Sequence, residues 1–262
     1  MTTSCLRIES EAHGTAWITL ARPARHNAFD ELLIAELTAA LEGCERNDSV
    51  NTVILSAEGK NFSAGADLEW MRRAAGQTHE QNVADAQGLA TLMRTLDELA
   101  KPTIALAHGA TFGGGVGLIA CCDIAIAATD ATFCFSETRL GLIPAVISPF
   151  VIAAIGVRNA RRYFQTAEAF GVDIARSIGL VHEVLPQSAL RERALALAEA
   201  LAATAPGAKA ASKRLIRNVA GRPMGDDISD LTARAIADTR AGDEAKEGIA
   251  AFFEKRKPRW KR

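Results

Sequence analysis

Hydrophobic and polar residues alternate in two short segments at the start of the chain, Leu6 to Glu11 and Ala16 to Leu20. This alternation is typical of strands. Apolar residues then recur at helical spacing from Leu32 to Leu41, after Asn27 or Asp30, either of which can cap a helix. The pattern predicts an opening β-hairpin followed by a surface helix.

Short apolar runs of the kind found in buried strands follow the hairpin. They are Val53 to Leu55, Thr103 to Leu106, Asp123 to Ala127 and Thr132 to Phe135, and a helical stretch from Gln81 to Leu99 separates the first two. Strands that alternate with helices are typical of βαβ units with a parallel sheet. The first two thirds of the chain are therefore expected to form an α/β core.

The pattern changes at Ser188, where strand signals stop. Four segments with helical periodicity follow, at 190–203, 208–219, 226–238 and 244–255. The sequence predicts a core over residues 1–187 and a helical region over 188–262. The chain ends in a basic cluster, residues 255–262, which is either a solvated tail or an anion contact.

Composition narrows the protein class. The 262 residues are 48% hydrophobic and 23% charged, which is enough for a large core without disulfides or metal. A net charge of −1 offers no surface for nucleic acid. The five cysteines form no CxxC pair and are expected to be free, buried thiols. With no export signal and no apolar stretch of about 20 residues, the sequence predicts a cytoplasmic protein that does not enter a membrane.

Two loops rich in small residues follow predicted strands. The first is 61–68, Asn-Phe-Ser-Ala-Gly-Ala-Asp-Leu, and the second is 112–117, Phe-Gly-Gly-Gly-Val-Gly, which opens an apolar helix. Small side chains let backbone N–H groups point at a ligand, and a helix N-terminus favours negative charge. Such donors can stabilise an oxyanion that develops on a carbonyl. An ordinary turn, for the first loop, and close helix packing, for the second, are the alternative interpretations.

Familiar catalytic motifs are missing from the sequence. There is no GKS or GKT after the glycines, no GxGxxG, no GxSxG and no HExxH, which argues against nucleotide chemistry, serine hydrolysis and zinc proteolysis. One acid draws attention, because Glu137 ends an apolar strand, where burial of a carboxylate is costly. It is a candidate general acid/base; a salt bridge to Arg139 or a helix cap are the alternatives.

These segments together resemble the enoyl-CoA hydratase/isomerase (crotonase) family over nearly the whole chain. The matching motifs are Arg22-Pro23 with Asn27-Ala28, Ala64 to Asp67, Gly113 to Gly115, Glu137 before Ile143-Pro144, and Glu247-Gly248-Ile249. The resemblance implies a crotonase-like (ClpP/crotonase) ββα spiral core with a C-terminal helical trimerisation region. It also implies a homotrimer, or a homohexamer built as a dimer of trimers. Coenzyme A would be part of the substrate, and no cofactor or metal is expected.

The resemblance also implies roles for single residues. The backbone N–H groups of Ala66 and Gly114 would form the oxyanion hole for the thioester oxygen, and Glu137 would exchange a proton at the α-carbon. Asp123 would be structural. The residues expected to bind coenzyme A fall into three groups: Arg25 and Lys255 at the phosphates, Ala64 and Leu68 at the adenine and pantetheine, and Asp67 beside them.

One position departs from the family pattern. Typical hydratases carry a second glutamate where this chain has Gly117. Two enzyme activities remain open, a Δ3,Δ2-enoyl-CoA isomerase with one carboxylate and a hydratase for branched or carboxylated acyl groups. The segments 140–149 and 160–164 look most like the methylglutaconyl-CoA hydratase-like branch, linked to leucine or acyclic terpene breakdown, which favours a hydratase acting on a substrate such as 3-methylglutaconyl-CoA.

Two further expectations follow. Loss of the second glutamate would suit a β-methyl branch and a distal carboxylate, with Arg72, Arg73 or Arg139 as the partner of that carboxylate. A catalytically silent relative that binds acyl-CoA or RNA is the non-enzyme alternative.

Overall fold

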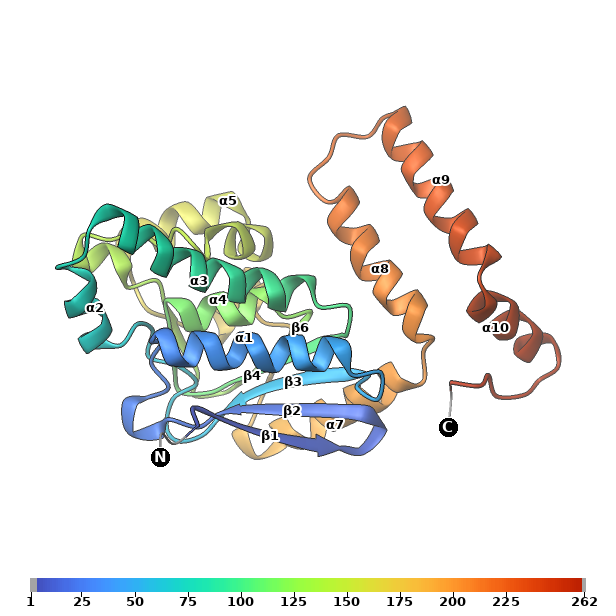
Figure 1. Cartoon of the computed structure of the whole chain (residues 1–262), viewed down its shortest axis with the longest axis horizontal. Coiled ribbons are helices and arrows are strands. Elements are labelled where there is room, and N and C mark those ends of the chain that lie inside the picture. Colours follow the sequence, from blue (N-terminus) through green and yellow to red (C-terminus); the bar gives the residue numbers. More distant parts are fainter. Residues whose placement is uncertain (1–3, 261–262) are drawn as a thin grey trace.

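A six-stranded sheet forms the frame of the computed structural model, which describes residues 4–260 (Figure 1). Its strands, in spatial order, are β1 (Leu6–Glu11), β2 (Thr15–Leu20), β3 (Thr52–Ala57), β4 (Thr103–Ala107), β6 (Ile124–Ala128) and β9 (Glu183–Leu185). β1 and β2 pair antiparallel, and every later pair is parallel. The predicted hairpin and parallel sheet are confirmed.

A second, three-stranded sheet contains β5 (Ala110–Phe112), β7 (Thr132–Cys134) and β8 (Phe170–Gly171). β4 continues into β5 and β6 into β7, so each chain segment gives its first strand to the large sheet and its second to the small one. A helix follows each second strand, which makes repeated ββα units. The strands β5, β8 and β9, each of two or three residues, were not predicted.

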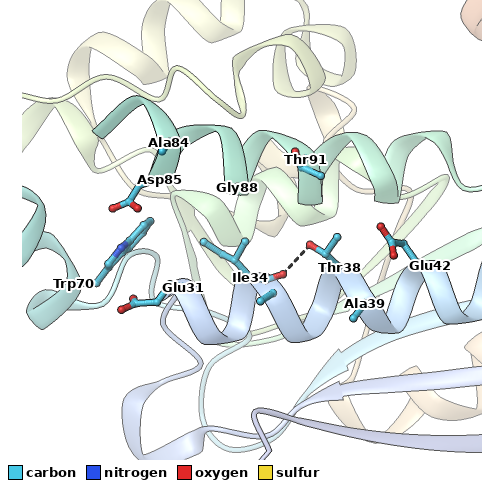
Figure 2. A pocket seen from close by; sticks show the side chains of 11 residues that line it. Glu31, Ile34, Thr38, Ala39, Glu42, Trp70, Ala84, Asp85, Gly88 and Thr91 are labelled. Carbon is cyan, nitrogen blue, oxygen red and sulfur yellow. Dashed lines mark hydrogen bonds between the residues drawn. The ribbon is translucent and has the colours of Figure 1, made fainter. Parts of the chain in front are cut away.

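Helices cover one face of the large sheet. α1 (Glu31–Arg46) and α3 (His79–Glu98) lie side by side, with a groove of about 460 Å³ between them (Figure 2). α1 begins where the Asp30 side chain accepts a hydrogen bond from the Leu33 N–H at 2.9 Å, so Asp30 and not Asn27 is its cap. α4 (Gly114–Cys121) packs beside α3, and α5 (Ser148–Thr166) packs against α4.

Alternate residues of the sheet enter two separate apolar clusters. Val53 and Leu55 face the helices just described, and Ile54 faces the opposite side. That opposite side is covered by α7 (Leu190–Ala202) through Leu190 and Ala194. Within the described residues no strand follows the predicted boundary at residue 188, but α7, the first α-helix beyond it, is packed on the core.

The last three helices project away from the core (Figure 1). They are α8 (Pro206–Val219), α9 (Asp226–Ala241) and α10 (Asp243–Phe253). Asp123 ties α8 to the sheet, because its carboxylate accepts hydrogen bonds from the Thr103 N–H at 2.8 Å and from Lys213 Nζ at 2.9 Å. A structural role for Asp123 agrees with these contacts.

The cysteine prediction is confirmed, since all five thiols are free and buried. Burial is the main reason that the pKa of Cys122 is raised to about 12, so this thiol stays protonated at neutral pH. Within residues 4–260, no helix is long and apolar enough to cross a membrane. The same residues contain no group of three or more His, Cys, Asp or Glu that would hold a metal ion.

Candidate active site

A mostly apolar cavity of about 500 Å³ lies where the two small-residue loops meet. Its walls come from the loops at 64–66 and 113–114, from α2 (Leu68–Ala74) and α3, and from the segment 136–147. Glu137 and Asp85 are the ionisable side chains in this lining, and no Lys, Arg or His belongs to it among the described residues. A ligand in this cavity would therefore meet two carboxyl groups and backbone polar groups in an otherwise apolar lining.

The first loop is held in place by a buried asparagine. Asn27 Nδ2 donates to the carbonyl oxygens of Glu58 and Asn61, each at 2.9 Å. Ser63 Oγ donates to the Asn27 carbonyl at 2.9 Å. Asn27 is thus the anchor of residues 58–63, a role that its side chain fills because a buried amide must satisfy both its donors and its acceptor.

Backbone N–H groups are available where the two loops face each other. Phe29 pairs with the first loop by donating to the Gly65 carbonyl and accepting from the Asp67 N–H, and this leaves the Ala66 N–H free. Gly114 is the first residue of α4, whose leading N–H groups lack intrahelical acceptors. No backbone hydrogen bond within residues 4–260 uses either N–H. Neither N–H therefore has an acceptor within the described residues, which leaves both available to a ligand oxygen.

Gly65 and Gly113 bring these loops together. They have φ values of 91° and 49°, a region that side chains disfavour. A Cβ added to Gly113 would lie 3.8 Å from Gly65 Cα and 3.1 Å from Glu137 Oε1. The two loops and the carboxylate therefore lie close together around Gly113, with no room there for a side chain.

Glu137 has the environment of a general acid/base. It begins a 3-10 turn (Glu137–Leu140) after β7, and its Oε2 is buried without a hydrogen-bond partner. Burial raises its pKa above the ordinary value, because the charged form is poorly solvated there. Arg139 does not pair with it, since its guanidinium donates to the Ala167 carbonyl at 2.5 Å. The salt-bridge interpretation of Glu137 is therefore wrong.

Gly117 faces an isoleucine instead of open space. A Cβ at this position would lie 2.3 Å from Ile147 Cγ2 and 3.1 Å from Met93 Cε. Ile147 is buried and also lines the cavity. The volume that a second glutamate would need is therefore filled by an apolar side chain. Within the same glycine run, a Cβ added to Gly115 would lie 2.9 Å from Ser63 Cβ, so the close-packing interpretation holds for that residue.

The predicted coenzyme A contacts of the first loop lie at the mouth of the cavity. Ala64, Ala66 and Leu68 line it, and Leu68 is 74% exposed. Asp67 instead caps α2 by accepting from the Glu69 and Trp70 N–H groups.

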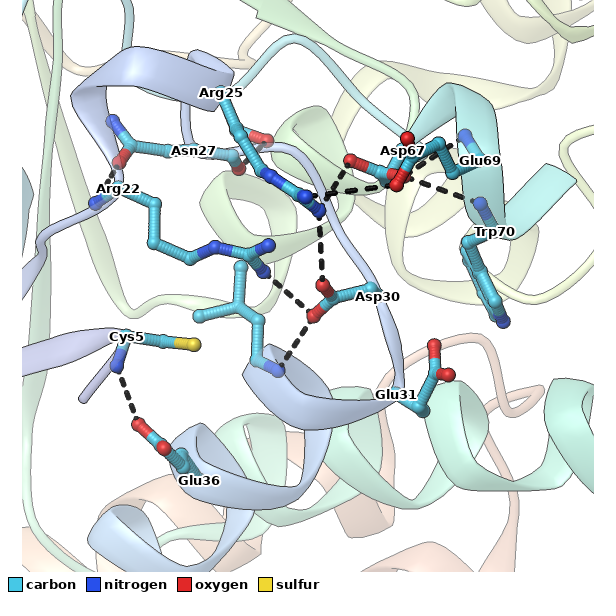
Figure 3. Close-up of polar contacts among 12 residues, drawn as sticks. Cys5, Arg22, Arg25, Asn27, Asp30, Glu31, Glu36, Asp67, Glu69 and Trp70 are labelled. Atoms are coloured by element: carbon cyan, nitrogen blue, oxygen red, sulfur yellow. Dashed lines mark hydrogen bonds and ion pairs between the residues drawn. The ribbon is translucent and has the colours of Figure 1, made fainter. Parts of the chain in front are cut away.

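Arg25 is held beside this loop (Figure 3). Its guanidinium forms ion pairs with Asp67 at 3.4 Å, Glu69 at 3.5 Å and Asp30 at 3.9 Å. About half of its side chain stays exposed to solvent.

Four other cations proposed from the sequence do not line the cavity. Lys255 follows α10, at the opposite end of the molecule from α2 in Figure 1, so one chain does not bring Lys255 and Arg25 together. Arg72 and Arg73 are exposed on α2, and Arg73 pairs with Glu31 at 2.7 Å. With Arg139 bonded to Ala167, the expected partner for a distal carboxylate is not found among these arginines.

Among the lining residues that sequence analysis did not assign to the site, Ile147 and Asp85 bear most on its chemistry. Ile147 becomes relevant only through its contact with Gly117, thirty positions away, for which the chain gives no local signal. Asp85 has a signal, because Asn82, Asp85, Ala86 and Leu89 recur at the spacing of one helix face. That face lines the cavity, and it carries a carboxylate among apolar neighbours.

Known proteins resemble this chain in both sequence and structure. The family model described as Enoyl-CoA hydratase/isomerase matches residues 10–262. A solved enoyl-CoA hydratase from Shewanella pealeana superimposes with a TM-score of 0.95 and 46% identity, covering 98% of this chain and 96% of that one. AtuE from Pseudomonas aeruginosa gives a TM-score of 0.92 and 36% identity over 98% and 100% of the two chains. An enoyl-CoA hydratase of Alternaria alternata is 35% identical over 94% of this chain and 81% of its own. The fold predicted from the sequence is confirmed.

Proposed function

Because the chain belongs to the enoyl-CoA hydratase/isomerase family, we propose that it adds water across the α,β double bond of a branched enoyl-CoA thioester. The observation that carries the proposal is the meeting of one buried carboxyl, Glu137, with the free N–H groups of Ala66 and Gly114. These two donors would bind the thioester oxygen and stabilise the enolate-like state as charge moves onto it.

Glu137 would handle both protons of the reaction. In its protonated form it gives a proton to the α-carbon, while the oxygen of water bonds to the β-carbon. The proton released by that water returns to the Glu137 carboxylate, so atoms and charge balance over one turnover. A pKa raised by burial supports this cycle, because it brings the two protonation states closer in free energy near neutral pH.

The acyl group would be branched at the β-carbon. Ile147 fills the space beside Gly117 and gives the cavity an apolar wall where other hydratases carry a carboxylate. Such a wall suits a methyl branch. The substrate predicted from the sequence is 3-methylglutaconyl-CoA. The apolar wall supports its methyl branch, but the described lining contains no cation that would pair with its distal carboxylate.

A Δ3,Δ2-enoyl-CoA isomerase is the second candidate. The single acid beside Gly113 favours it, because isomerisation needs one carboxylate to move a proton between the α- and γ-carbons and needs no water. The two activities differ in what happens to the conjugated thioester.

Absorbance of the conjugated thioester separates the candidates. A hydratase should remove the absorbance of the conjugated thioester from crotonyl-, 3-methylcrotonyl- and 3-methylglutaconyl-CoA. An isomerase should create that absorbance from a 3-enoyl thioester. We expect loss with 3-methylcrotonyl-CoA, and a Glu137→Gln variant slower by about 100-fold or more. Glu199→Gln, an exposed glutamate on α7, is the matched control. Unchanged turnover in Glu137→Gln would remove the proposed role.

The oligomer is also a proposal. The last helices carry large exposed apolar side chains, Ile216, Ile249, Phe252 and Phe253. Burial of such residues between chains would support the predicted trimer or hexamer. Sedimentation should give three or six chains per particle, and replacing Phe252 and Phe253 by serine should shift the particle toward the monomer.

A further inference from the structure

Asp85 is a carboxylate without a partner. None of the hydrogen bonds or ion pairs formed within residues 4–260 uses its side chain, and its Oδ2 is buried from solvent. An acceptor that has lost its water and gained no donor is unfavourable, and an ionised one more so. Oδ2 of the half-buried Asp85 side chain is such an acceptor, and a bound molecule could supply the donor that the protein does not.

The position of Asp85 shows where that donor would come from. Asp85 and Trp70 belong both to the wall of the active-site cavity and to the α1–α3 groove, so these two side chains separate the spaces. Figure 2 shows the carboxylate beside the indole of Trp70. On the cavity side, Asp85 shares its helix face with Asn82, Ala86 and Leu89. A guest in the cavity can therefore reach it.

Asp85 stands apart from the catalytic end of the cavity. Met93, beside Gly117, lies eight residues further along α3, which is about 12 Å of helix. Glu137 meets the two glycine loops, whereas Asp85 lies toward α2 and the start of α3. The acyl chain that leaves the oxyanion donors would extend in this direction, since the lining between is apolar.

We propose that Asp85 is a specificity-determining residue that accepts a hydrogen bond from a hydroxyl group on the acyl chain and repels a carboxylate there. The inference rests on the proposed acyl-CoA function of the site. A hydroxyl supplies the donor that Asp85 lacks. A carboxylate would meet a like charge in a lining whose described residues include no Lys, Arg or His. Among acyl groups, the structure thus assigns preference to a hydroxylated chain over a dicarboxylic one.

Binding of saturated thioesters tests this preference without turnover. Calorimetry would compare hexanoyl-CoA with its 6-hydroxy and 6-carboxylate counterparts, and repeat the set with eight carbons to vary reach. At one chain length or both, we expect the hydroxyl to tighten binding about 10-fold relative to the methyl end. The carboxylate should weaken it by at least about 10-fold.

Variants separate the charge from the hydrogen bond. Asp85→Leu should lose both effects, while Asp85→Asn should keep the hydroxyl preference and lose the repulsion of the carboxylate. Asp173→Asn, an exposed aspartate on α6 (Val172–Ser177), is the control. Equal affinities for the three ligands at both lengths, an unchanged preference in Asp85→Leu, tightest binding of the carboxylate, or no binding at all would overturn the inference. Binding preference without any turnover would overturn only the hydratase.

Discussion

A methyl group added at position 117 should test whether Ile147 occupies the missing glutamate's place. In an ordinary helix, Gly→Ala stabilises by about 1 kcal/mol. Here the new Cβ would lie 2.3 Å from Ile147 Cγ2 and 3.0 Å from Ile147 Cβ, distances that require movement. Ile147 is buried and β-branched, so it moves poorly. Overpacking of this kind costs about 1–3 kcal/mol, which leaves Gly117→Ala less stable by up to about 2 kcal/mol.

A double-mutant cycle isolates that contact. Ile147→Ala alone should cost about 2–5 kcal/mol through the cavity it leaves. In that background the Cγ2 clash is gone, so Gly117→Ala should become neutral or stabilising, with a coupling of about 2 kcal/mol. Urea denaturation followed by circular dichroism, at one fixed protein concentration, measures all four proteins. The same gain of about 1 kcal/mol from Gly117→Ala in both backgrounds would refute the reasoning.

Three further predictions follow from the site. Because the pKa of Glu137 is raised, the folded protein keeps its proton to a higher pH than the unfolded chain does, so wild-type stability falls as pH rises from about 4.5 through the folded pKa. In urea titrations, Glu137→Gln should therefore gain stability relative to wild type at pH 8 and not at pH 4.5. An equal difference in stability at both pH values contradicts this. Arg25→Ala should raise KM for acyl-CoA several-fold and leave KM for the acyl-pantetheine, which lacks the nucleotide phosphates, unchanged; a parallel rise for both removes the phosphate role. Asp30→Ala should cost about 2–3 kcal/mol in thermal or urea unfolding, because α1 loses its cap and Arg22 loses an ion pair at 2.6 Å; a loss below about 0.5 kcal/mol argues against both contacts.

Much of the fold could be predicted because periodicity survives in the longer elements. Helices α7 to α10 begin within about two residues of their predicted starts, and β1 to β4 lie where alternation or apolar runs placed them. α5 was not predicted from the sequence; its Pro149 stands in the first turn, where proline is favoured.

The site divides in the same way. Glu137 and the two loops were predicted, because runs of small residues and an acid at the end of an apolar strand can be recognised in the sequence itself. Ile147 depends on a contact between segments distant in the chain, which only the folded structure brings together. Asp85 has a helix-face signal, but that the face lines the cavity is shown only by the packing of α3 in the folded structure. The expectation that arginines would pair with a distal carboxylate failed for a similar reason, since Arg139 turns to the Ala167 carbonyl.

The central claim is that Glu137 moves a proton at the α-carbon of a thioester held by the Ala66 and Gly114 N–H groups. Deuterium incorporation at that carbon, followed by NMR in D₂O with a 3-methyl enoyl thioester as substrate, measures this step. The wild-type protein should label the α-carbon of the product, and Glu137→Gln should label it at least about 100-fold more slowly while binding the thioester with similar affinity. Labelling at the wild-type rate in Glu137→Gln would contradict the account.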